Sequence, residues 1–156
     1  MEKYNLNNKL ENDLDILKEI FTVLKLTSKY YIKLCKKFNI TQIQFQVLYL
    51  LYISEDNCIK MSTLGDKLEM ARSGVTILVD RMALARLVKR RPDIEYRRII
   101  NVIITEKGNK IMNEIFQSNG IFKVFTLDFI QKEEKELLCK LIIKIKEKLE
   151  SKVYIV

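Results

Sequence analysis

The sequence predicts a mainly α-helical protein with one small β-hairpin, and three observations support this fold class. Apolar side chains recur at steps of three and four residues through most of the chain, as the buried faces of amphipathic helices require. One proline and four glycines in 156 residues leave few helix breakers. A run rich in β-branched residues and arginine lies between 87 and 104, and Pro92-Asp93 interrupts it as in a hairpin turn.

Two helices are predicted in the first third of the chain. The first runs from Leu6 to about Phe38, which is longer than one small core can cover. Thr41 can cap the second helix, which is apolar around most of its circumference. We therefore expect the second helix to be the buried centre of the domain. Residues 58–60 then leave room for only a very short strand.

Two short helices with a tight connection follow. We expect Ser62 to cap the first, Thr63–Met70, and Ser73 to cap the second, which runs to about Ala85. The spacing predicts an inward stripe on the second helix formed by Val75, Leu78, Val79 and Met82. This arrangement is a helix-turn-helix, and small side chains at the start of its second helix would let the backbone approach a DNA groove. An ordinary surface helical hairpin is the alternative.

The predicted hairpin carries an unusual concentration of positive charge. All seven arginines lie between 72 and 98, whereas both flanks use only lysine. Between 86 and 98, six basic residues oppose two acidic ones. Because arginine can bind phosphate or a guanine edge through two parallel hydrogen bonds, this confinement favours recognition of nucleic acid. We expect the hairpin to be a wing that follows DNA phosphates and enters the minor groove; a solvated charged face is the alternative.

The last third of the chain is predicted to be helical again. Thr105 to Gly108 predicts the start of one helix, with a kink near 118–120 and with Phe122 and Phe125 on its apolar side. A final helix covers about 132–153. Since both ends of the chain have apolar helix faces that one winged helix does not need, we expect a two-fold dimer to bury them. Packing back onto the monomer is the alternative.

The composition argues against enzymatic chemistry. The chain has no histidine, which excludes a Ser-His-Asp triad, a histidine base and any imidazole-dependent zinc site. Its glycines are too far apart for a phosphate loop, and its three cysteines form no C-x-x-C pair. We therefore expect no catalytic residues, no metal and no cofactor. Without a membrane-spanning run or a signal peptide, the expected location is the cytoplasm, with reduced thiols.

From about Leu10 to Leu149, the order of elements and several motifs resemble the MarR (multiple antibiotic resistance regulator) family of dimeric winged-helix transcription regulators. Residues 61–70 and 73–82 resemble that family's helix-turn-helix, including its V-T-x-x-V-D-R-L pattern in Val75 to Met82. Leu87-Val88-x-Arg90 and the later Ile104-Thr105-Glu106-Lys107-Gly108, similar to the family's L-T-E-K-G, bracket the hairpin at the expected distance.

The resemblance implies a single domain over 1–156, namely a winged helix-turn-helix flanked by N- and C-terminal dimerisation helices. The winged-helix core would cover about 41–105, and the dimerisation helices about 6–38 and 106–153. Two positions depart from the family pattern. Arg86 replaces a glycine at the end of a helix, where a left-handed backbone is often needed. In the wing, Tyr96-Arg97-Arg98 stands where the family has D-x-R, with Glu95 as the candidate replacement for the aspartate.

Together these features predict a sequence-specific transcriptional regulator, a repressor rather than an activator. It would bind double-stranded DNA as a homodimer, on a pseudo-palindrome with half-sites about one helical turn apart. The expected phosphate ligands are Lys60, Arg72, Arg90 and Arg91. The expected base contacts are Ser73, Thr76 and Arg81, and Arg97 or Arg98 would enter the minor groove. The alternative is a winged helix that docks an acidic protein partner through its basic hairpin.

The family commonly senses a small aromatic molecule or cysteine oxidation. The resemblance implies an effector pocket near the junction of the first two helices, where the aromatic residues are Tyr30, Tyr31, Phe45, Tyr49 and Tyr52. Plain core packing is the alternative for these side chains. Cys35 lies beside three lysines that could lower its pKa, but buried, inert thiols are expected for Cys35, Cys58 and Cys139.

Overall fold

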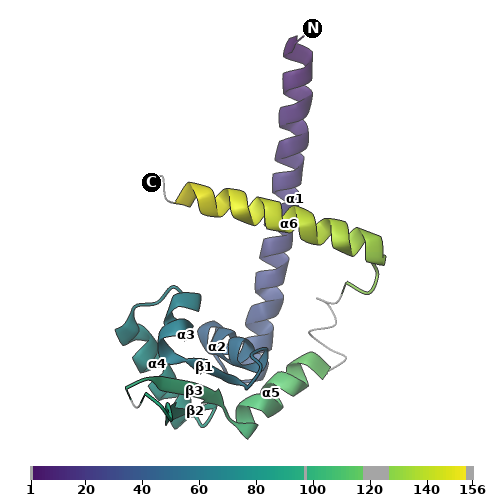
Figure 1. Ribbon diagram of the computed structural model, residues 1–156. Coiled ribbons are helices and arrows are strands. Elements are labelled where there is room, and N and C mark those ends of the chain that lie inside the picture. The colour runs from purple at the N-terminus through teal and green to yellow at the C-terminus, as the bar shows by residue number, and fades with distance from the viewer. Residues whose placement is uncertain (1, 97, 118–126, 154–156) are drawn as a thin grey trace. The chain divides into compact units, whose positions relative to one another are not determined.

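The computed structural model describes residues 2–96, 98–117 and 127–153 (Figure 1). The chain divides into two compact units, residues 1–118 and residues 119–156. The first unit contains five helices and three strands among its described residues, in the order α1 (Glu2–Lys37), α2 (Gln42–Tyr52), β1 (Cys58–Lys60), α3 (Met61–Lys67), α4 (Arg72–Leu84), β2 (Val88–Pro92), β3 (Ile100–Ile104) and α5 (Glu106–Gln117). The second unit contains α6 (Lys132–Val153). This is the predicted mainly helical fold with a small wing.

Helix α2 is the centre of the first unit, as its apolar circumference predicts. Val47, Leu48 and Leu51 are completely buried, and α2 packs against α1, α5, β1 and β3. Its start is fixed by a capping box: the Gln44 backbone N–H donates to the Thr41 hydroxyl, and the Thr41 N–H donates to the Gln44 side chain. The predicted Thr41 cap is therefore confirmed.

Helices α3 and α4 form the predicted helix-turn-helix, but both predicted serine caps are wrong. The N-cap residues are Lys60 and Ala71, and neither makes a side-chain capping hydrogen bond. Helix α3 begins directly at the end of β1, so the last strand residue, Lys60, takes the cap position and Ser62 lies inside the helix. The turn between the helices covers only residues 68–71, and Glu69 in it occupies the left-handed region with φ of 52°. The predicted inward stripe of α4 is confirmed, because Val75, Leu78, Val79 and Met82 are all buried.

The three strands form an antiparallel sheet in the order β1-β3-β2. Strand β2 pairs with β3 from Val88 opposite Ile104 to Pro92 opposite Ile100, and this pair is the predicted wing hairpin. Strand β3 begins at Ile100, directly after the loop that Asp93 and Ile99 close through a backbone hydrogen bond of 2.8 Å. Arg97 lies outside the described residues.

The end of α4 explains how Arg86 replaces the expected glycine. Arg86 adopts a left-handed conformation with φ of 58°, so the family-like turn is kept. Its carbonyl accepts a hydrogen bond of 2.6 Å from the Thr105 hydroxyl, and that hydroxyl accepts one from the Gly108 N–H at the start of α5. Thr105 therefore joins the end of α4 to the start of α5, and its predicted capping role is confirmed.

The apolar residues of the later helices have two different environments. In α5, Met112 and Ile115 are buried within the first unit, where α5 packs on α2. In α6, apolar side chains stay exposed, namely Leu137, Leu141, Ile142, Ile145 and Leu149. The kink predicted near 118–120 and the side chains of Phe122 and Phe125 lie outside the described residues. Of the described helices, none combines the length and the hydropathy that a bilayer crossing requires.

The contact at Gly108 predicts a stability difference between two glycine substitutions. A Cβ at Gly108 would lie 2.5 Å from the Leu87 carbonyl oxygen and 2.7 Å from Ile104 Cγ1, so Gly108→Ala should lower the free energy of unfolding by about 1–3 kcal/mol. At Gly74 in α4, a Cβ would meet only the flexible end of Met70 at 3.3 Å. Gly74→Ala should therefore be neutral or stabilising, because alanine favours helix. Urea unfolding at one protein concentration checks both; equal stabilities would contradict the packing described for α5.

Candidate nucleic-acid interface

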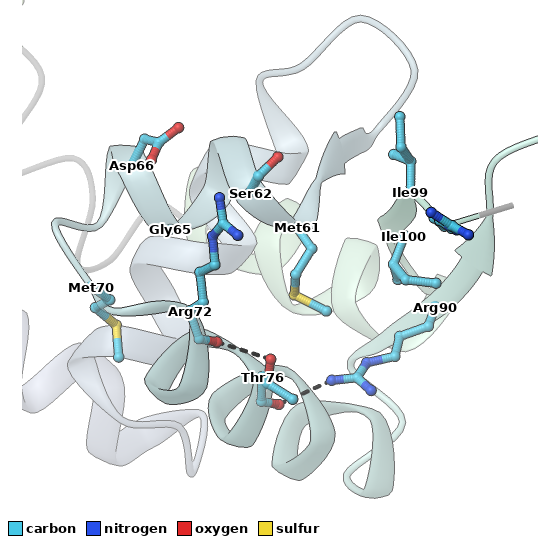
Figure 2. Close-up of a pocket in the computed structure, with 11 residues that line it drawn as sticks. Met61, Ser62, Gly65, Asp66, Met70, Arg72, Thr76, Arg90, Ile99 and Ile100 are labelled. Carbon is cyan, nitrogen blue, oxygen red and sulfur yellow. Dashed lines mark hydrogen bonds between the residues drawn. The ribbon is translucent and has the colours of Figure 1, made fainter. Parts of the chain in front are cut away.

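A groove of about 530 Å³ lies between α3, α4 and the base of the wing. It brings together four of the predicted site residues, Arg72, Thr76, Arg90 and Arg98. The rest of its lining comes from α3, the turn after it and β3, and consists of Met61, Ser62, Gly65, Asp66, Met70, Ile99 and Ile100. Figure 2 shows the side chains of α4 and β2 approaching each other across this groove. Residues far apart in the chain thus form one basic concave surface.

Arg72 and Arg98 are the uncompensated cations of this groove. Both are exposed, and in the described part of the chain no carboxylate forms an ion pair with either of them. Arg72 lies in the first turn of α4, and its side chain extends toward α3 (Figure 2). Asp66 is the acidic residue in the lining. The two free guanidinium groups make the groove suited to an anionic backbone.

Arg90 has a different environment from the other arginines of the groove. Its Nη1 atom lies 2.8 Å from a carboxylate oxygen of Asp80, and its Nη2 donates a hydrogen bond of 3.0 Å to the Thr76 carbonyl (Figure 2). Both partners belong to α4. The guanidinium of Arg90 therefore connects β2 to α4 with its charge already paired.

The remaining predicted DNA contacts lie outside this groove. Lys60, Ser73, Arg81 and Arg91 are exposed but do not line it. On the side of α4 opposite its buried stripe, Gly74 is half-buried and the remaining residues are exposed, namely Ser73, Thr76, Ile77, Asp80 and Arg81. Ile77 belongs to this face with 53% of its surface exposed, although the sequence analysis did not assign it a contact. The spacing of the inward stripe already places Ile77 on the opposite, outward side of the helix, and this was the sequence signal for a contact.

The wing loop is organised by Asp93 and not by Glu95, the candidate suggested by the sequence. The Asp93 carboxylate accepts hydrogen bonds from the backbone N–H groups of Glu95 and Tyr96, at 3.1 and 3.2 Å. Its second oxygen accepts a hydrogen bond of 3.0 Å from the Asn101 side chain in β3. An aspartate three residues earlier than Tyr96 thus holds the loop that leads to Arg98.

The predicted aromatic residues form a packed cluster around α2. Phe45 contacts Tyr31 edge to face and stacks on Tyr49, with centroid distances of 5.1 and 6.3 Å. Phe116 of α5 stacks on Tyr52 at 5.3 Å and extends the cluster, a contact that the sequence analysis did not assign. The hydroxyl of Tyr52 donates to the Asn113 side chain, and burial raises the pKa of Tyr31 to about 12. Tyr30, the remaining predicted aromatic residue, has 37% of its surface exposed.

A shallow hollow of about 320 Å³ lies beside this cluster, between α2 and α3. Phe45 and Tyr49 form its aromatic wall, and Lys67 and Glu69 supply charged groups opposite them. Most of the aromatic surface is nevertheless used in ring-to-ring packing. The cluster therefore serves the core in this structure, and only Phe45 and Tyr49 also border an open space.

The three cysteines have different environments. Cys35 is buried, and its burial raises the pKa of the thiol, so the idea that neighbouring lysines activate it is wrong. Cys58 is half-buried, whereas Cys139 on α6 is exposed, so the expectation of three buried thiols is wrong for Cys139. Helix α6 exposes its apolar residues in the same way, which explains this error. Among the described residues, no cluster of three or more cysteine, aspartate and glutamate side chains could hold a metal ion.

Comparison with known proteins connects this geometry to one family. A sequence profile described as the MarR family matches residues 38–99, which cover α2, the helix-turn-helix and the first part of the wing. The part of the chain that forms most of the groove is therefore similar to the MarR family.

Several individual proteins are similar to this chain at low sequence identity. The HTH-type transcriptional regulator MhqR of Bacillus subtilis is 28% identical over 106 residues, which are 68% of this chain and 72% of MhqR. The HTH-type transcriptional repressor MdtR of the same organism is 25% identical over 89 residues, little more than half of either protein. The solved structure of reduced AbfR bound to DNA has a TM-score of 0.59 and 20% identity, covering 92% of this chain and 97% of AbfR.

The hydrogen bonds of the wing loop predict a measurable titration. The hydrogen bond from the Asn101 side chain contributes most to lowering the pKa of Asp93. The hydrogen bonds from the backbone N–H groups of Tyr96 and Glu95 lower this pKa further. Because the folded wing favours the carboxylate, this stabilisation is present above pH of about 4 and is lost as the pH falls through the lowered pKa. NMR shifts of the Glu95 and Tyr96 amides should titrate with a midpoint below that of free aspartate.

Replacing Asn101 by alanine should raise that midpoint, since the largest cause of the shift is removed. Asn113→Ala is the matched control, because this asparagine binds Tyr52 and does not contact Asp93. An unchanged midpoint in Asn101→Ala would contradict the role described for Asp93.

Proposed function

We propose that this protein is a MarR-family homodimeric repressor that recognises a pseudo-palindromic DNA operator through α4 and the wing. The observation that carries the proposal is the groove that Arg72 of α4 and Arg98 of the wing share with Thr76, because neither guanidinium forms an ion pair with a carboxylate of the described residues. Such a surface offers phosphate ligands on both sides of a helix that can enter the major groove. The reported AbfR structure contains DNA, which agrees with this use of the fold.

Helix α4 would read the bases in the major groove. Ser73, Thr76 and Arg81 are exposed on its outward face, and arginine is suited to the acceptor pair of guanine. The exposed Ile77 on the same face would contact a thymine methyl group. A half-site that contains both guanine and thymine is therefore expected.

The wing and the neighbouring helix ends would hold the backbone and the minor groove. Lys60, Arg72 and Arg91 are exposed cations suited to phosphates. Arg98 follows the loop that Asp93 organises, so it, or the adjacent Arg97, would enter the minor groove. Arg90 was predicted from sequence as a phosphate ligand, but its pairing with Asp80 makes it the least available of the predicted cations.

Dimerisation would bury the apolar faces of α1 and α6. Leu14, Leu17, Phe21 and Leu24 follow one another along α1 and are between 46% and 67% exposed. A hollow on α1 is lined by Leu14, Leu17 and Phe21 together with Lys18, Thr22 and Lys25. Helix α6 carries a second exposed apolar set. A two-fold partner would cover both sets and set the spacing of two α4 helices to about one DNA turn. The single-domain organisation over 1–156, with a core at 41–105, is part of this proposal.

Repression released by a small aromatic effector is the regulatory part of the proposal. The relative MdtR is named a repressor, which supports the direction of regulation. The hollow beside Phe45 and Tyr49 is the site for the effector, and Tyr30, Tyr31 and Tyr52 would form the wall behind it. Because Lys67 of α3 lines this hollow, effector binding there would change the position of the helix-turn-helix. The proposed location is the cytoplasm, with no cofactor.

Selection of binding sites from a random duplex library tests the proposed function. An enriched inverted repeat with half-sites about one turn apart is the expected result. If no motif is enriched and all duplexes bind weakly, the second candidate function takes over, namely docking of an acidic protein partner on the basic hairpin. The concentration of arginine in the wing is the observation that favours this second candidate.

Neutralising Arg98 should weaken DNA binding in a salt-dependent way. Arg98→Gln is expected to cost about 1–3 kcal/mol on the selected duplex and to reduce the slope of log affinity against log salt by about one. Lys110→Gln is the control, because it removes the same charge from an exposed position on α5. Fluorescence anisotropy over a salt series measures both quantities; equal slopes for the two variants would remove Arg98 from the interface.

A charge on the apolar face of α1 should separate the dimer. Phe21 is 67% exposed in the single chain, so Phe21→Asp would bury a carboxylate only if a partner covers this face. We expect sedimentation to give the mass of one chain for this variant and of two for the parent. Leu84→Asp changes an equally apolar residue on α4 that is 85% exposed, and should keep the mass of two chains. A dimeric Phe21→Asp would rule out this interface.

A further inference from the structure

Two residues of the interface, Asp80 and Arg90, do not fit a surface built only to attract phosphates. Asp80 is an acidic residue on the outward face of α4, with 52% of its side chain exposed. A carboxylate at this position repels DNA phosphates. Arg90 on β2 is the cation that faces it, and its side chain is 32% exposed. Attraction of DNA therefore does not explain why an acidic residue occupies this position.

The contacts of Arg90 explain the presence of Asp80. One nitrogen of the guanidinium lies 2.8 Å from Asp80, and the other donates to the Thr76 carbonyl at 3.0 Å. Asp80 and Thr76 are separated by one helical turn, so the guanidinium of Arg90 bridges two successive turns of α4. Figure 2 shows its contact with Thr76. A lysine would have to reach both acceptors from a single nitrogen, whereas arginine offers two terminal nitrogens in a fixed plane.

The other end of this connection is the rigid part of the wing. Arg90 is in the middle of β2 and is paired with Val102 of β3. Strand β2 ends at Pro92. The next residue, Asp93, begins the wing loop and accepts a hydrogen bond from the Asn101 side chain in β3. The contacts of Arg90 therefore connect α4 to the strand that leads into the loop before Arg98.

We propose that Arg90 and Asp80 are positioning residues, which fix the wing to the recognition helix so that both reach DNA at one spacing, and that Arg90 is not a phosphate ligand. The inference rests on the proposed DNA-binding function and refines it. In this account Asp80 improves DNA binding despite its negative charge. If Arg90 were instead a phosphate ligand, Asp80 would compete with DNA for it. The two accounts therefore predict opposite signs for the removal of Asp80.

The test measures DNA affinity for four variants on the selected duplex. Asp80→Asn and Arg90→Gln should each weaken binding about tenfold, and the double variant should be no weaker than either single one. The salt slope should stay that of the parent, since no phosphate contact is lost. Lys89→Gln is the control: it removes a charge from the adjacent, exposed position of β2 and leaves Asp80 paired.

Tighter binding by Asp80→Asn, or a slope reduced by about one in Arg90→Gln, would overturn the proposal. Hydrogen exchange of the free protein gives a reading that does not depend on DNA. The amides of Glu95 and Tyr96 should exchange faster in both single variants than in Lys89→Gln, and unchanged exchange would overturn the proposal even if the parent binds no DNA. If a single variant does not fold, Asp80→Arg combined with Arg90→Asp restores the pair, and parental exchange rates are then expected.

Discussion

The burial of helix α2 is the constraint on which the rest of the first unit depends. Val47, Leu48 and Leu51 are completely removed from solvent, and α2 contacts a helix before it in the chain, a helix far after it, and two of the three strands. Each of these elements carries only one apolar face, so none can stay in place without α2. The helix-turn-helix and the wing are consequently held from behind, and their outward faces need no buried side chains of their own.

Freed from packing, the outward face is organised by hydrogen bonds and charge. Thr105 ties the end of α4 to α5, Asp93 shapes the wing loop, and Arg90 joins the wing to α4. Each of these groups is fixed to backbone or to an opposite charge, so Arg72 and Arg98, which pair with no carboxylate in the described part of the chain, are carried by a positioned frame. A rigid frame lowers the ordering cost of binding and makes the distance between α4 and the wing part of the recognition.

Sequence patterns correctly predicted the features that follow from periodicity and local chemistry. They failed for features that depend on individual contacts between elements. The inward stripe of α4 and the Thr41 cap follow from spacing and local chemistry, and both are confirmed. The caps at Ser62 and Ser73 were wrong because a strand and a tight turn lead directly into the helices, which a preference for serine cannot reveal. Likewise, arginine content predicted a basic wing but could not distinguish Arg90, paired with Asp80, from Arg98, which has no such partner. That difference depends on a contact between residues ten positions apart on separate elements.

The central claim is that the exposed face of α4 reads bases while the wing supports it. Repeating the binding-site selection with Arg81→Gln tests this claim most directly, because Arg81 is exposed on α4 and lies outside the groove that holds Arg72 and Arg98. The account predicts that the variant loses its preference at one position in each half-site and keeps the remaining motif and the half-site spacing. An unchanged motif, bound with equal selectivity at every position, would contradict base recognition by this side chain of α4.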